Sequence, residues 1–474
     1  MASTTYLQWQ HTTAGNRNTW TMSMWVKLSK FGDEFPLFSS ASDAQNQDLA
    51  FIQNDGTLRW WTYQSDAYAG QLKTNRVFRD VNAWYHLVFV FDSTNSTADD
   101  RMKIYVNGVQ ETSFATRANP NQNLNSLWNG TLWRNIGHDS SGGYTDEFDG
   151  LMSHIHFVDG TALTASTFGS TDSTTGEWKI NTAPSYTVGT KGFFILKDGN
   201  SVTDQSANSN NFTVAGGTLT KTEDNPSNVF CTMNSLNHDY ANTNTDLGAG
   251  NTFVYPRDNG NYTYAMSTLA MPKGNGKFYF EAKYVQYDGV IAGVGIVNMD
   301  YASDIFYQNR QLMQHTTSTD IGRVLLNKAG YSIISGATND AYGFGTWSNG
   351  DIICMACDME NGAFYFRKNG GSWANSGDPT SGSTKTGAID ISATSQWTSS
   401  SDWGIWCGDN EGNHDRFSFN FGNGNFPSQS GSFGSQTYSA TAVSSAGSNA
   451  SGIGIFEYDV PTGYTALSTK GLNL

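Results

Sequence analysis

The chain has 474 residues, more than one ordinary hydrophobic core accommodates, so we expect two domains or slightly more. Its 27 basic and 42 acidic residues give a net charge of -15 without a lysine or arginine cluster, which argues against DNA or RNA as a partner. No run approaches the roughly 18–20 apolar residues of a membrane span, and residues 1–10 lack the pattern of a secretory signal, so we expect neither membrane insertion nor a signal peptide.

Residues 1–165 carry short aromatic and β-branched runs separated by Gly, Thr, Ser and Asn, a pattern typical of antiparallel β-structure. We expect one β-sandwich here, with strands in the runs Met22–Leu28, Asp48–Tyr63, Trp84–Ser93 and Arg101–Gln110. Residues 87–91 are apolar without interruption, which predicts a strand that is buried on both faces.

Residues 166–249 are richer in turns and hold isolated apolar runs, so we interpret them as an ordered connector. Residues 250–427 return to strand-like runs and predict a second sandwich. Residues 428–474 start as a Gly/Ser-rich tail and end in an apolar anchor, which predicts a short C-terminal strand. The predicted fold class is therefore all-β, with two jelly-roll sandwiches joined by the connector.

One order of features occurs twice, in residues 84–108 and 350–370: an apolar run, an Asp, a polar turn, an aromatic-rich run and Asn-Gly. We therefore expect a similar hairpin in each sandwich. The second stretch also holds Cys354 and Cys357 in C-x-x-C spacing. Residues i and i+3 of a strand point to opposite faces and lie about 10 Å apart, beyond the ~7 Å that a disulfide tolerates. We expect ordinary buried thiols rather than a redox or zinc site.

Residues 1–165 resemble the LamG-like, concanavalin-type jelly roll. The motifs that carry the resemblance are Met24-Trp25-Val26, Trp84-Tyr85-His86-Leu87, Ile104–Gly108 and the closing segment Glu147–Gly169. Residues 250–427 resemble a SPRY domain through Gly276–Glu281, the hairpin Gly350–Gly370 and Phe419–Gly422.

The order of motifs between residues 154 and 234, with the ending Val460–Leu467, resembles segments of marine bacteriophage proteins that combine LamG-like and SPRY-like domains. This resemblance implies a virion or tail-associated protein.

An acidic cluster at residues 146–149 invites a comparison with concanavalin-type glucanases, which carry E-x-D-x-x-E on one strand. Glu147 and Asp149 match the first two acids, but Met152 occupies the third position. We therefore expect no catalytic residue and a protein that is not an enzyme. A glycan-degrading hydrolase with a displaced partner acid is the alternative hypothesis.

Calcium is the possible cofactor that the resemblance implies, because LamG-like domains and jelly-roll lectins often bind it through loop carboxylates. The candidate ligands are Asp92, Asp99 and Asp100 in one loop and Asp146 and Asp149 in another. A second alternating pattern, from Asp409 to Asp415, lacks the Gly and Glu of a calcium loop. His154 and His156 share a strand face, but the sequence places no third metal ligand beside them.

Aromatic side chains are the candidate ligand contacts, because sugars stack on rings and bond to neighbouring amides. They are Trp61 and Tyr63 on one strand face, Trp128, Trp133 and Tyr144 in turn-rich segments, and Tyr342 and Trp347 in a Gly-rich part of the SPRY-like half.

These observations lead to a functional hypothesis. We expect a non-enzymatic structural protein of a phage particle, either tail- or fibre-associated or capsid-decorating, that is located in the virion and multimeric within an assembly. Its partners would be host-surface polysaccharide and other virion proteins. Besides the hydrolase, an intracellular SPRY adaptor is a third hypothesis, disfavoured because the chain has no RING-like cysteine set and no coiled-coil heptads.

Overall fold

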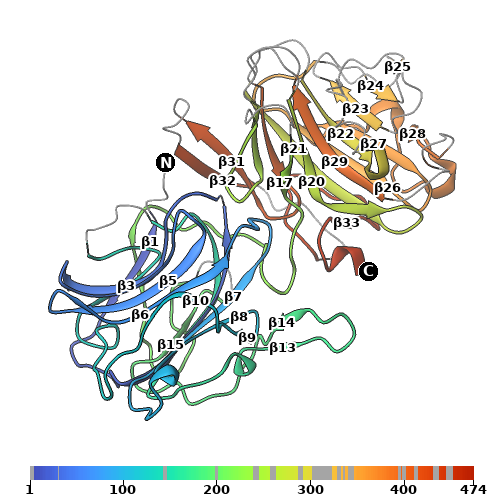
Figure 1. Ribbon diagram of the computed structural model, residues 1–474. Helices are drawn as coiled ribbons and strands as arrows, with labels where there is room; N and C mark the ends of the chain where they lie inside the picture. The colour runs from blue at the N-terminus through green and yellow to red at the C-terminus, as the bar shows by residue number, and fades with distance from the viewer. Residues whose placement is uncertain are drawn as a thin grey trace. The chain divides into compact units, whose positions relative to one another are not determined.

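A computed structural model describes most of the chain. The described residues are 5–29, 31–141, 147–197, 201–238, 245–256, 263–286, 292–301, 323–327, 332–334, 337–339, 346–392, 397, 402–409, 415–430, 437–444 and 452–473. The chain divides into two compact units: unit 1 holds residues 1–221 and 225–227, and unit 2 holds residues 222–224 and 228–474. Each unit contains two large sheets whose strands pair almost entirely antiparallel (Figure 1), which confirms the predicted all-β fold class. Among the described residues, no helix is long and apolar enough to cross a membrane.

Unit 1 is a sandwich of an eight-stranded and a six-stranded sheet. The larger sheet has the order β10 (Phe114–Ala118), β6 (Ala67–Val77), β5 (Thr57–Gln64), β4 (Asn46–Ile52), β3 (Phe35–Asp43), β11 (Trp133–Ile136), β1 (Tyr6–Gln10), β16 (Thr213–Gly216). The smaller has the order β15 (Phe193–Ile195), β12 (Gly150–Asp159), β2 (Thr19–Leu28), β7 (Tyr85–Asp92), β8 (Met102–Val106), β9 (Val109–Gln110), and a separate hairpin pairs β13 (Gly169–Thr171) with β14 (Trp178–Ile180).

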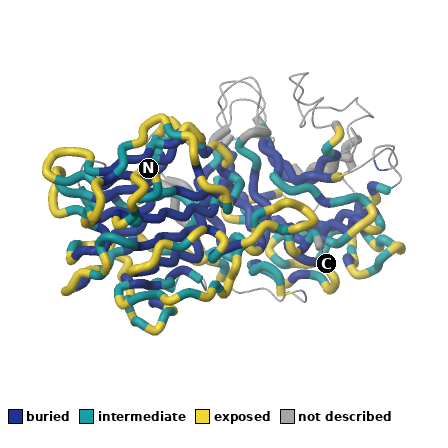
Figure 2. The backbone as a smooth tube through the Cα atoms, turned by 60° about the horizontal axis from the view of Figure 1, so that its bottom comes forward, coloured by how far each residue is buried: buried dark blue, intermediate teal, exposed yellow. Residues whose placement is uncertain are grey.

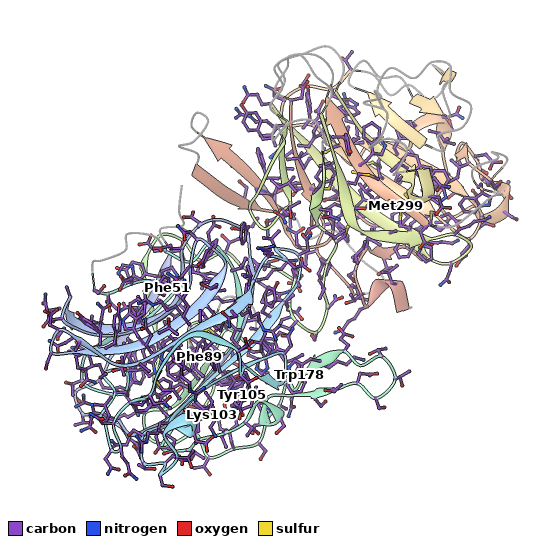
Figure 3. The ribbon with its side chains drawn as sticks, viewed as in Figure 1. Phe51, Phe89, Lys103, Tyr105, Trp178 and Met299 are labelled. Carbon is purple, nitrogen blue, oxygen red and sulfur yellow. The ribbon has the colours of Figure 1, made fainter. Side chains whose placement is uncertain are left out.

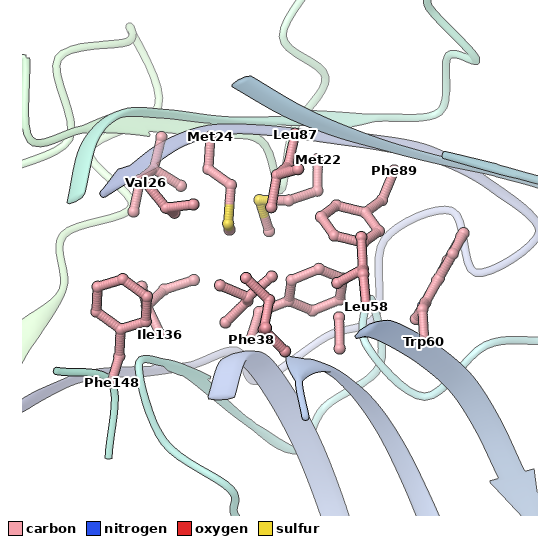
Figure 4. Close-up of a cluster of buried hydrophobic side chains, with 14 of the residues drawn as sticks. Met22, Met24, Val26, Phe38, Leu58, Trp60, Leu87, Phe89, Ile136 and Phe148 are labelled. Carbon is pink, nitrogen blue, oxygen red and sulfur yellow. The ribbon is translucent and has the colours of Figure 1, made fainter. Parts of the chain in front are cut away.

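Strict alternation places one side of each strand in the core of unit 1. Opposite residues across the larger sheet form a core-facing row that contains Leu7, Ile136, Phe38, Ala50 and Trp60. Figure 4 shows side chains of both sheets meeting between the layers, and the main chain is buried along the strands and exposed at the loops (Figure 2). Period-two burial of this kind is the physical basis of a two-layer sandwich.

The six-stranded sheet is covered on its second face as well. Val88 and Val90 of β7 and Tyr105 of β8 pack against Phe168 and Trp178, which belong to residues 161–190. Figure 3 labels Tyr105 and Trp178 beside each other on this face and Phe89 on the core side. We call residues 161–190 the first covering segment. Strand β7 is thus buried on both faces, as the uninterrupted apolar run predicts.

Unit 2 repeats the two-sheet plan. One sheet has the order β17 (Met233–His238), β20 (Thr263–Pro272), β29 (Asp402–Asp409), β22 (Ala292–Asn298), β23 (Arg323–Asn327), β24 (Ser332–Ile334), β25 (Ala337–Asn339). The other has the order β18 (Thr245–Gly248), β19 (Phe253–Pro256), β30 (Arg416–Asn420), β21 (Lys277–Gln286), β26 (Ile352–Asp358), β27 (Ala363–Lys368), β28 (Ile389–Asp390), with β33 (Thr465–Ala466) parallel to β21. β31 (Asn425–Ser430) and β32 (Thr437–Ala442) form a separate hairpin.

Strand β26 is also buried on both faces, and this places the two C-x-x-C cysteines apart. Cys357 packs in the core between the sheets, in the same cluster as Cys407, whereas Cys354 packs on the opposite face. All four cysteines are free and buried. The prediction of ordinary thiols is confirmed, and burial raises the pKa of the Cys354 thiol to about 11, which keeps it protonated and unreactive.

The outer face of the β21–β26–β27 sheet is covered by the C-terminal part of the chain. Phe456, Tyr458 and Tyr464 from residues 452–468, the second covering segment, pack on Tyr279 and Cys354. The expected C-terminal strand is present as β33. The segment expected as a connector, residues 166–249, is divided between the units: β13–β16 belong to unit 1, and β17 and β18 to unit 2.

The predicted pair of similar hairpins is confirmed, and the likeness extends to hydrogen bonds. In the β7–β8 hairpin the Asn107 amide oxygen accepts from His86 N at 2.8 Å, and Asn107 N donates to His86 O at 2.9 Å. In the β26–β27 hairpin Asn369 makes the same two bonds with Ile352, both at 2.8 Å. Both Asn residues have positive φ, and a side chain on Gly108 would overlap the Trp178 ring, as one on Gly370 would overlap Tyr458. Each covering segment thus presses an aromatic ring on an Asn-Gly turn.

Replacement of Gly108 by Ala tests this contact. Gly108 has φ +82° and lies under Trp178, whereas Gly176 has φ +75° and open space around it. We expect Gly176→Ala to cost about 1 kcal/mol for the left-handed backbone alone. Gly108→Ala adds overpacking and costs roughly 2–4 kcal/mol in all. Denaturant unfolding, with amide exchange of residues 161–190 as the local readout, measures both; equal losses would contradict the packing of Trp178 on the turn.

Candidate functional site

The outer face of the eight-stranded sheet carries a row of accessible aromatic and amide side chains. Tyr68 lies opposite Tyr63, Tyr63 opposite Gln47, and Gln47 opposite Ala41. Asn135 pairs with Ser39 on the next strand, and two residues further along the antiparallel pair Trp133 comes opposite Ala41. Gln10 lies opposite Trp133 and completes the row. We call Tyr68, Tyr63, Gln47, Ala41, Trp133 and Gln10 the outer row.

Two aromatic rings stand at the Tyr68 end of the outer row, Gln47 and Ala41 follow, and Trp133 lies beside Gln10 at the other end. Tyr68 and Trp133 are 47% and 46% exposed, values unusual for large rings, and Tyr63 is partly exposed. Tyr63 and Trp133 are three strand spacings apart, or about 14 Å. This spacing suits an extended ligand that touches several strands rather than a single small ring.

A second layer of side chains supports the Tyr68 end. Trp61 is 3% exposed and packs edge-on against Phe51, with ring centroids 5.1 Å apart. Tyr68 contacts both Trp61 and Tyr63, at 6.0 and 4.9 Å between centroids. Figure 3 shows Phe51 on the outer side of the sheet, away from the core residue Phe89. The exposed rings are therefore held in place by buried ones.

The aromatic residues predicted as ligand contacts lie in different environments. Tyr63 and Trp133 belong to the outer row, and Trp61 forms its floor rather than its surface. Trp128 is fully buried and packs edge-on against Phe38 in the core of unit 1, so it offers no surface to a ligand. Trp347 is 3% exposed and packs against Tyr284 in the core of unit 2. Both expectations are corrected: a turn-rich neighbourhood does not prevent a Trp from filling a core. Tyr144 and Tyr342 lie outside the described residues.

Sequence reasoning missed Tyr68 and Arg59. Tyr68 directly follows the β5–β6 turn, in which Ser65 and Asp66 both have positive φ. The alternation of Arg59, Trp61 and Tyr63 along β5 was the available signal for a shared face. The register of β6 against β5, which brings Tyr68 opposite Tyr63, depends on that turn and had no signal of its own.

The candidate calcium ligands are engaged with other groups. Asp99 accepts from Asn119 Nδ2 at 2.6 Å and pairs with Arg117, and these contacts lower the pKa of its carboxyl. Asp100 pairs with Lys103 at 3.1 Å, and Asp92 accepts from Thr94 Oγ1 at 2.6 Å. Within the part of the chain that the structure describes, no three His, Cys, Asp or Glu side chains are grouped to hold a metal ion. These acids do not fit a common ion as they stand.

Asp149 accepts through its main-chain oxygen from Ser29, and Asp146 lies outside the described residues, as do most of residues 409–415. Calcium stays a prediction, and thermal unfolding in calcium chloride and in EDTA tests it.

Glu147, the first acid of the glucanase-like pattern, lies 3.4 Å from His138 Nδ1. A retaining glycosidase needs a second carboxyl group about 5 Å away as its partner. The pattern places Met152 where the third acid would be, and Met152 packs against the core of unit 1. Among the described residues, the ionisable partner of Glu147 is His138.

A buried Ser–His pair in unit 1 has the wrong proton arrangement for nucleophilic catalysis. His86 Nε2 lies 2.9 Å from Ser23 Oγ, and Trp178 Nε1 donates to His86 Nδ1 at 3.0 Å. Burial lowers the pKa of His86 to about 3, so the ring is neutral and its single proton sits on Nε2. The imidazole then donates to Ser23 and cannot take its proton. Catalysis by this pair would need the opposite tautomer.

His156 is buried beneath the same covering segment, and His154 is buried in the same strand. His156 Nδ1 lies 2.5 Å from Tyr186 OH, and its ring stacks on Phe194 at 3.7 Å between centroids. His154 has φ +47° at an irregularity in the pairing of β12 with β2, which breaks the regular alternation along the strand. The two rings serve packing within unit 1.

A buried carboxyl group anchors the second covering segment in unit 2. Glu281 accepts from Glu457 N and Tyr458 N, both at 2.9 Å, from Tyr279 OH at 3.0 Å and from Asn420 Nδ2 at 3.1 Å. Burial raises the pKa of Glu281 to about 7, although these donors act in the opposite direction. The group joins two strands of the sheet to the chain that covers it.

Comparison with known proteins identifies the first part of the chain. Residues 2–168 match the family model described as the concanavalin A-like lectin/glucanases superfamily. These residues form a concanavalin A-like, LamG-type domain, as their motifs suggest. No match to a curated protein was found.

Solved structures give weaker likenesses. The chain is similar to the SPRY domain of human HERC1 at 13% identity and a TM-score of 0.28, over 40% of this chain and 96% of that one. A putative carbohydrate binding protein from Bacteroides ovatus gives 14% identity and a TM-score of 0.29, over 46% and 60% of the two chains. The heptameric SAP-like pentraxin from Limulus polyphemus gives 18% identity and a TM-score of 0.27, over 41% of this chain and 90% of that one. Likenesses at this level say nothing about ligand or activity.

The pH dependence of stability tests the Glu281 anchor. The pKa of Glu281 is about 7 in the folded state and 4.5 in the unfolded chain, so the folded state holds the proton more tightly. The stability due to Glu281 is therefore complete below about pH 4.5 and is lost as pH rises through about 7. The loss amounts to about 3 kcal/mol. Glu281→Gln removes this titration, so the free energy of unfolding of the native protein minus that of the variant should fall between pH 5 and pH 8.

Glu360→Gln is the matched control, because this acid is about half exposed. The free energy of unfolding of the native protein minus that of Glu360→Gln should stay nearly constant between pH 5 and pH 8. A Glu281→Gln difference that is constant or rises with pH would refute the assigned role of the buried carboxyl.

Proposed function

We propose that the chain is a non-enzymatic binding protein that holds an extended glycan along the outer row of unit 1. The outer row is the observation that carries the proposal. It presents Tyr68, Tyr63 and Trp133 on one sheet face, with the amides of Gln47 and Gln10 beside them. Aromatic faces stack on the C–H faces of sugar rings, and amides bond to hydroxyl groups. The match of residues 2–168 to a family of lectins and glucanases supports the same class of ligand.

The rigidity of the site favours binding without chemistry. The rings stand on strands, and Tyr68 and Tyr63 rest on the buried Trp61 and Phe51, so few rotamers need to be fixed when a ligand docks. The hydrolase hypothesis is less well supported, since the third acid position is Met152 and Glu147 faces His138.

The location of the chain in a virion is the more specific part of the proposal. It rests on the order of motifs in residues 154–234 and 460–467, which resembles marine phage proteins, and would make host-surface polysaccharide the ligand and other virion proteins the neighbours. In this setting the chain is a tail-associated or capsid-decorating component. The position of its density on an intact particle tests the assignment.

Alanine substitutions in the outer row test glycan binding directly. A glycan array screened with the full chain identifies the ligand, and titration then measures its Kd. Loss of one stacking ring costs about 1–2 kcal/mol, so Tyr63→Ala and Trp133→Ala should each weaken binding by roughly 5- to 30-fold. Phe31→Ala is the control, because Phe31 is an equally exposed ring in a loop outside the outer row. An array with no binding at all, or equal losses in all three variants, would reject the site.

The absence of turnover is a separate prediction. Incubation of the full chain with the glycans that it binds should release no reducing ends. Release that Glu147→Gln abolishes, with binding intact, would replace the proposal by a hydrolase.

A further inference from the structure

We propose that Arg59 forms a subsite for an anionic group, a carboxylate or a sulfate ester, on the glycan that lies along the outer row. The inference rests on the proposed function and narrows its ligand to acidic polysaccharides. It starts from the position of one guanidinium group on the outer face of the eight-stranded sheet. Arg59 lies on β5, on the same strand face as Trp61 and Tyr63.

The guanidinium group lies over two aromatic rings. Its central carbon lies 4.5 Å from the centroid of the Trp61 ring and 5.2 Å from that of Tyr68. Arg59 Nη2 donates to Tyr68 OH at 2.8 Å, and the Gln71 amide oxygen, in the orientation that satisfies both groups, accepts from Arg59 Nε at 2.6 Å and from Arg59 Nη2 at 2.5 Å. These contacts fix the plane of the fork at the Tyr68 end of the outer row. Arg59 Nη1 has no hydrogen-bond acceptor among the described residues.

The charge of Arg59 is not neutralised by the fold, whereas neighbouring charges are. Lys73 pairs with Asp55 at 3.0 Å, Arg76 with Glu111 at 2.7 Å and Arg117 with Asp99 at 3.1 Å. Arg59 makes no ion pair with a carboxylate in the described part of the chain, and its contacts are neutral rings, a hydroxyl and an amide. Asp66, the nearby acid of the β5–β6 turn, accepts from Tyr63 OH at 3.0 Å. In a chain of net charge -15, an unpaired and oriented cation is a specific feature rather than part of a basic surface.

The chemistry of the site selects a planar or tetrahedral oxyanion. Since Nε and Nη2 are bonded to Gln71 and Tyr68, the N–H groups of Nη1 remain to donate to a carboxylate or sulfate oxygen, and such charge-assisted bonds are stronger than those to hydroxyl groups. A sugar that stacks on Tyr68 or Tyr63 brings its substituents to the edge of this fork. The ligand is therefore an acidic glycan whose ring contacts the outer row and whose charge contacts Arg59.

Two pairs of matched polymers test the inference with the full chain. Polygalacturonate is compared with its carboxyl-reduced form, and dextran sulfate with dextran, by calorimetry or biolayer interferometry at low and high salt. The native protein should bind at least one charged polymer about tenfold or more tightly than its neutral partner, with affinity that falls as salt rises. Which pair shows the preference distinguishes a carboxylate from a sulfate ligand.

Variants then locate the preference. Arg59→Gln should abolish it, whereas Arg59→Lys should retain part of it because the charge remains but the planar guanidinium is lost. Lys73→Gln is the matched control, since this neighbouring cation is already paired with Asp55, and should leave the preference intact. Thermal unfolding of each variant checks that the fold is preserved.

The outcomes separate this inference from the proposed function. Equal binding to charged and neutral polymers overturns the Arg59 subsite and leaves glycan binding in place. A charge preference that survives Arg59→Gln overturns the subsite as well. Absence of binding to all four polymers, together with an empty glycan array, overturns both.

Discussion

The need to cover both faces of the central strands governs the rest of this structure. Strands β7 and β26 carry apolar side chains on both faces, so a two-layer sandwich would leave one face of each in water. In unit 1 residues 161–190 cover the second face, and in unit 2 residues 452–468 do so. Each segment is fastened by an aromatic ring on an Asn-Gly turn, Trp178 on Gly108 and Tyr458 on Gly370. The turn needs Gly both for its positive φ and for the space beneath the ring.

This covering also accounts for side chains that resemble chemistry. His86 and Glu281 are buried ionisable groups next to hydroxyl or amide partners, an arrangement that in a cleft would suggest catalysis. Here each is hydrogen-bonded to the covering segment as well as to its own sheet: His86 to the Trp178 indole, and Glu281 to the main chain of Glu457 and Tyr458. Their shifted pKa values follow from burial beneath that segment. They fasten a layer rather than serve a reaction.

Much of the fold could be predicted from local pattern, whereas the candidate site could be predicted only in part. Uninterrupted apolar runs predicted the doubly buried β7, and strand geometry predicted the separation of Cys354 from Cys357, because both depend on period-two alternation alone. Nothing local distinguishes the buried Trp128 from the exposed Trp133, five residues later, because their burial depends on which layer each meets. The pairing of Tyr68 with Tyr63 depends on a turn in which two non-glycine residues have positive φ, a conformation without a clear sequence signal.

The same constraint indicates where unit 1 can meet a ligand. Both faces of the six-stranded sheet are buried. Among the described residues, the sheet face of unit 1 that remains open to a large ligand is therefore the outer face of the eight-stranded sheet. The exposed rings of Tyr68 and Trp133 on that face do not stabilise the fold, because apolar surface in contact with water is unfavourable. The exposure of these rings and the unpaired charge of Arg59 each cost the free protein stability that a bound acidic glycan would return. Binding of such a ligand would therefore account for both features of the face with one cause.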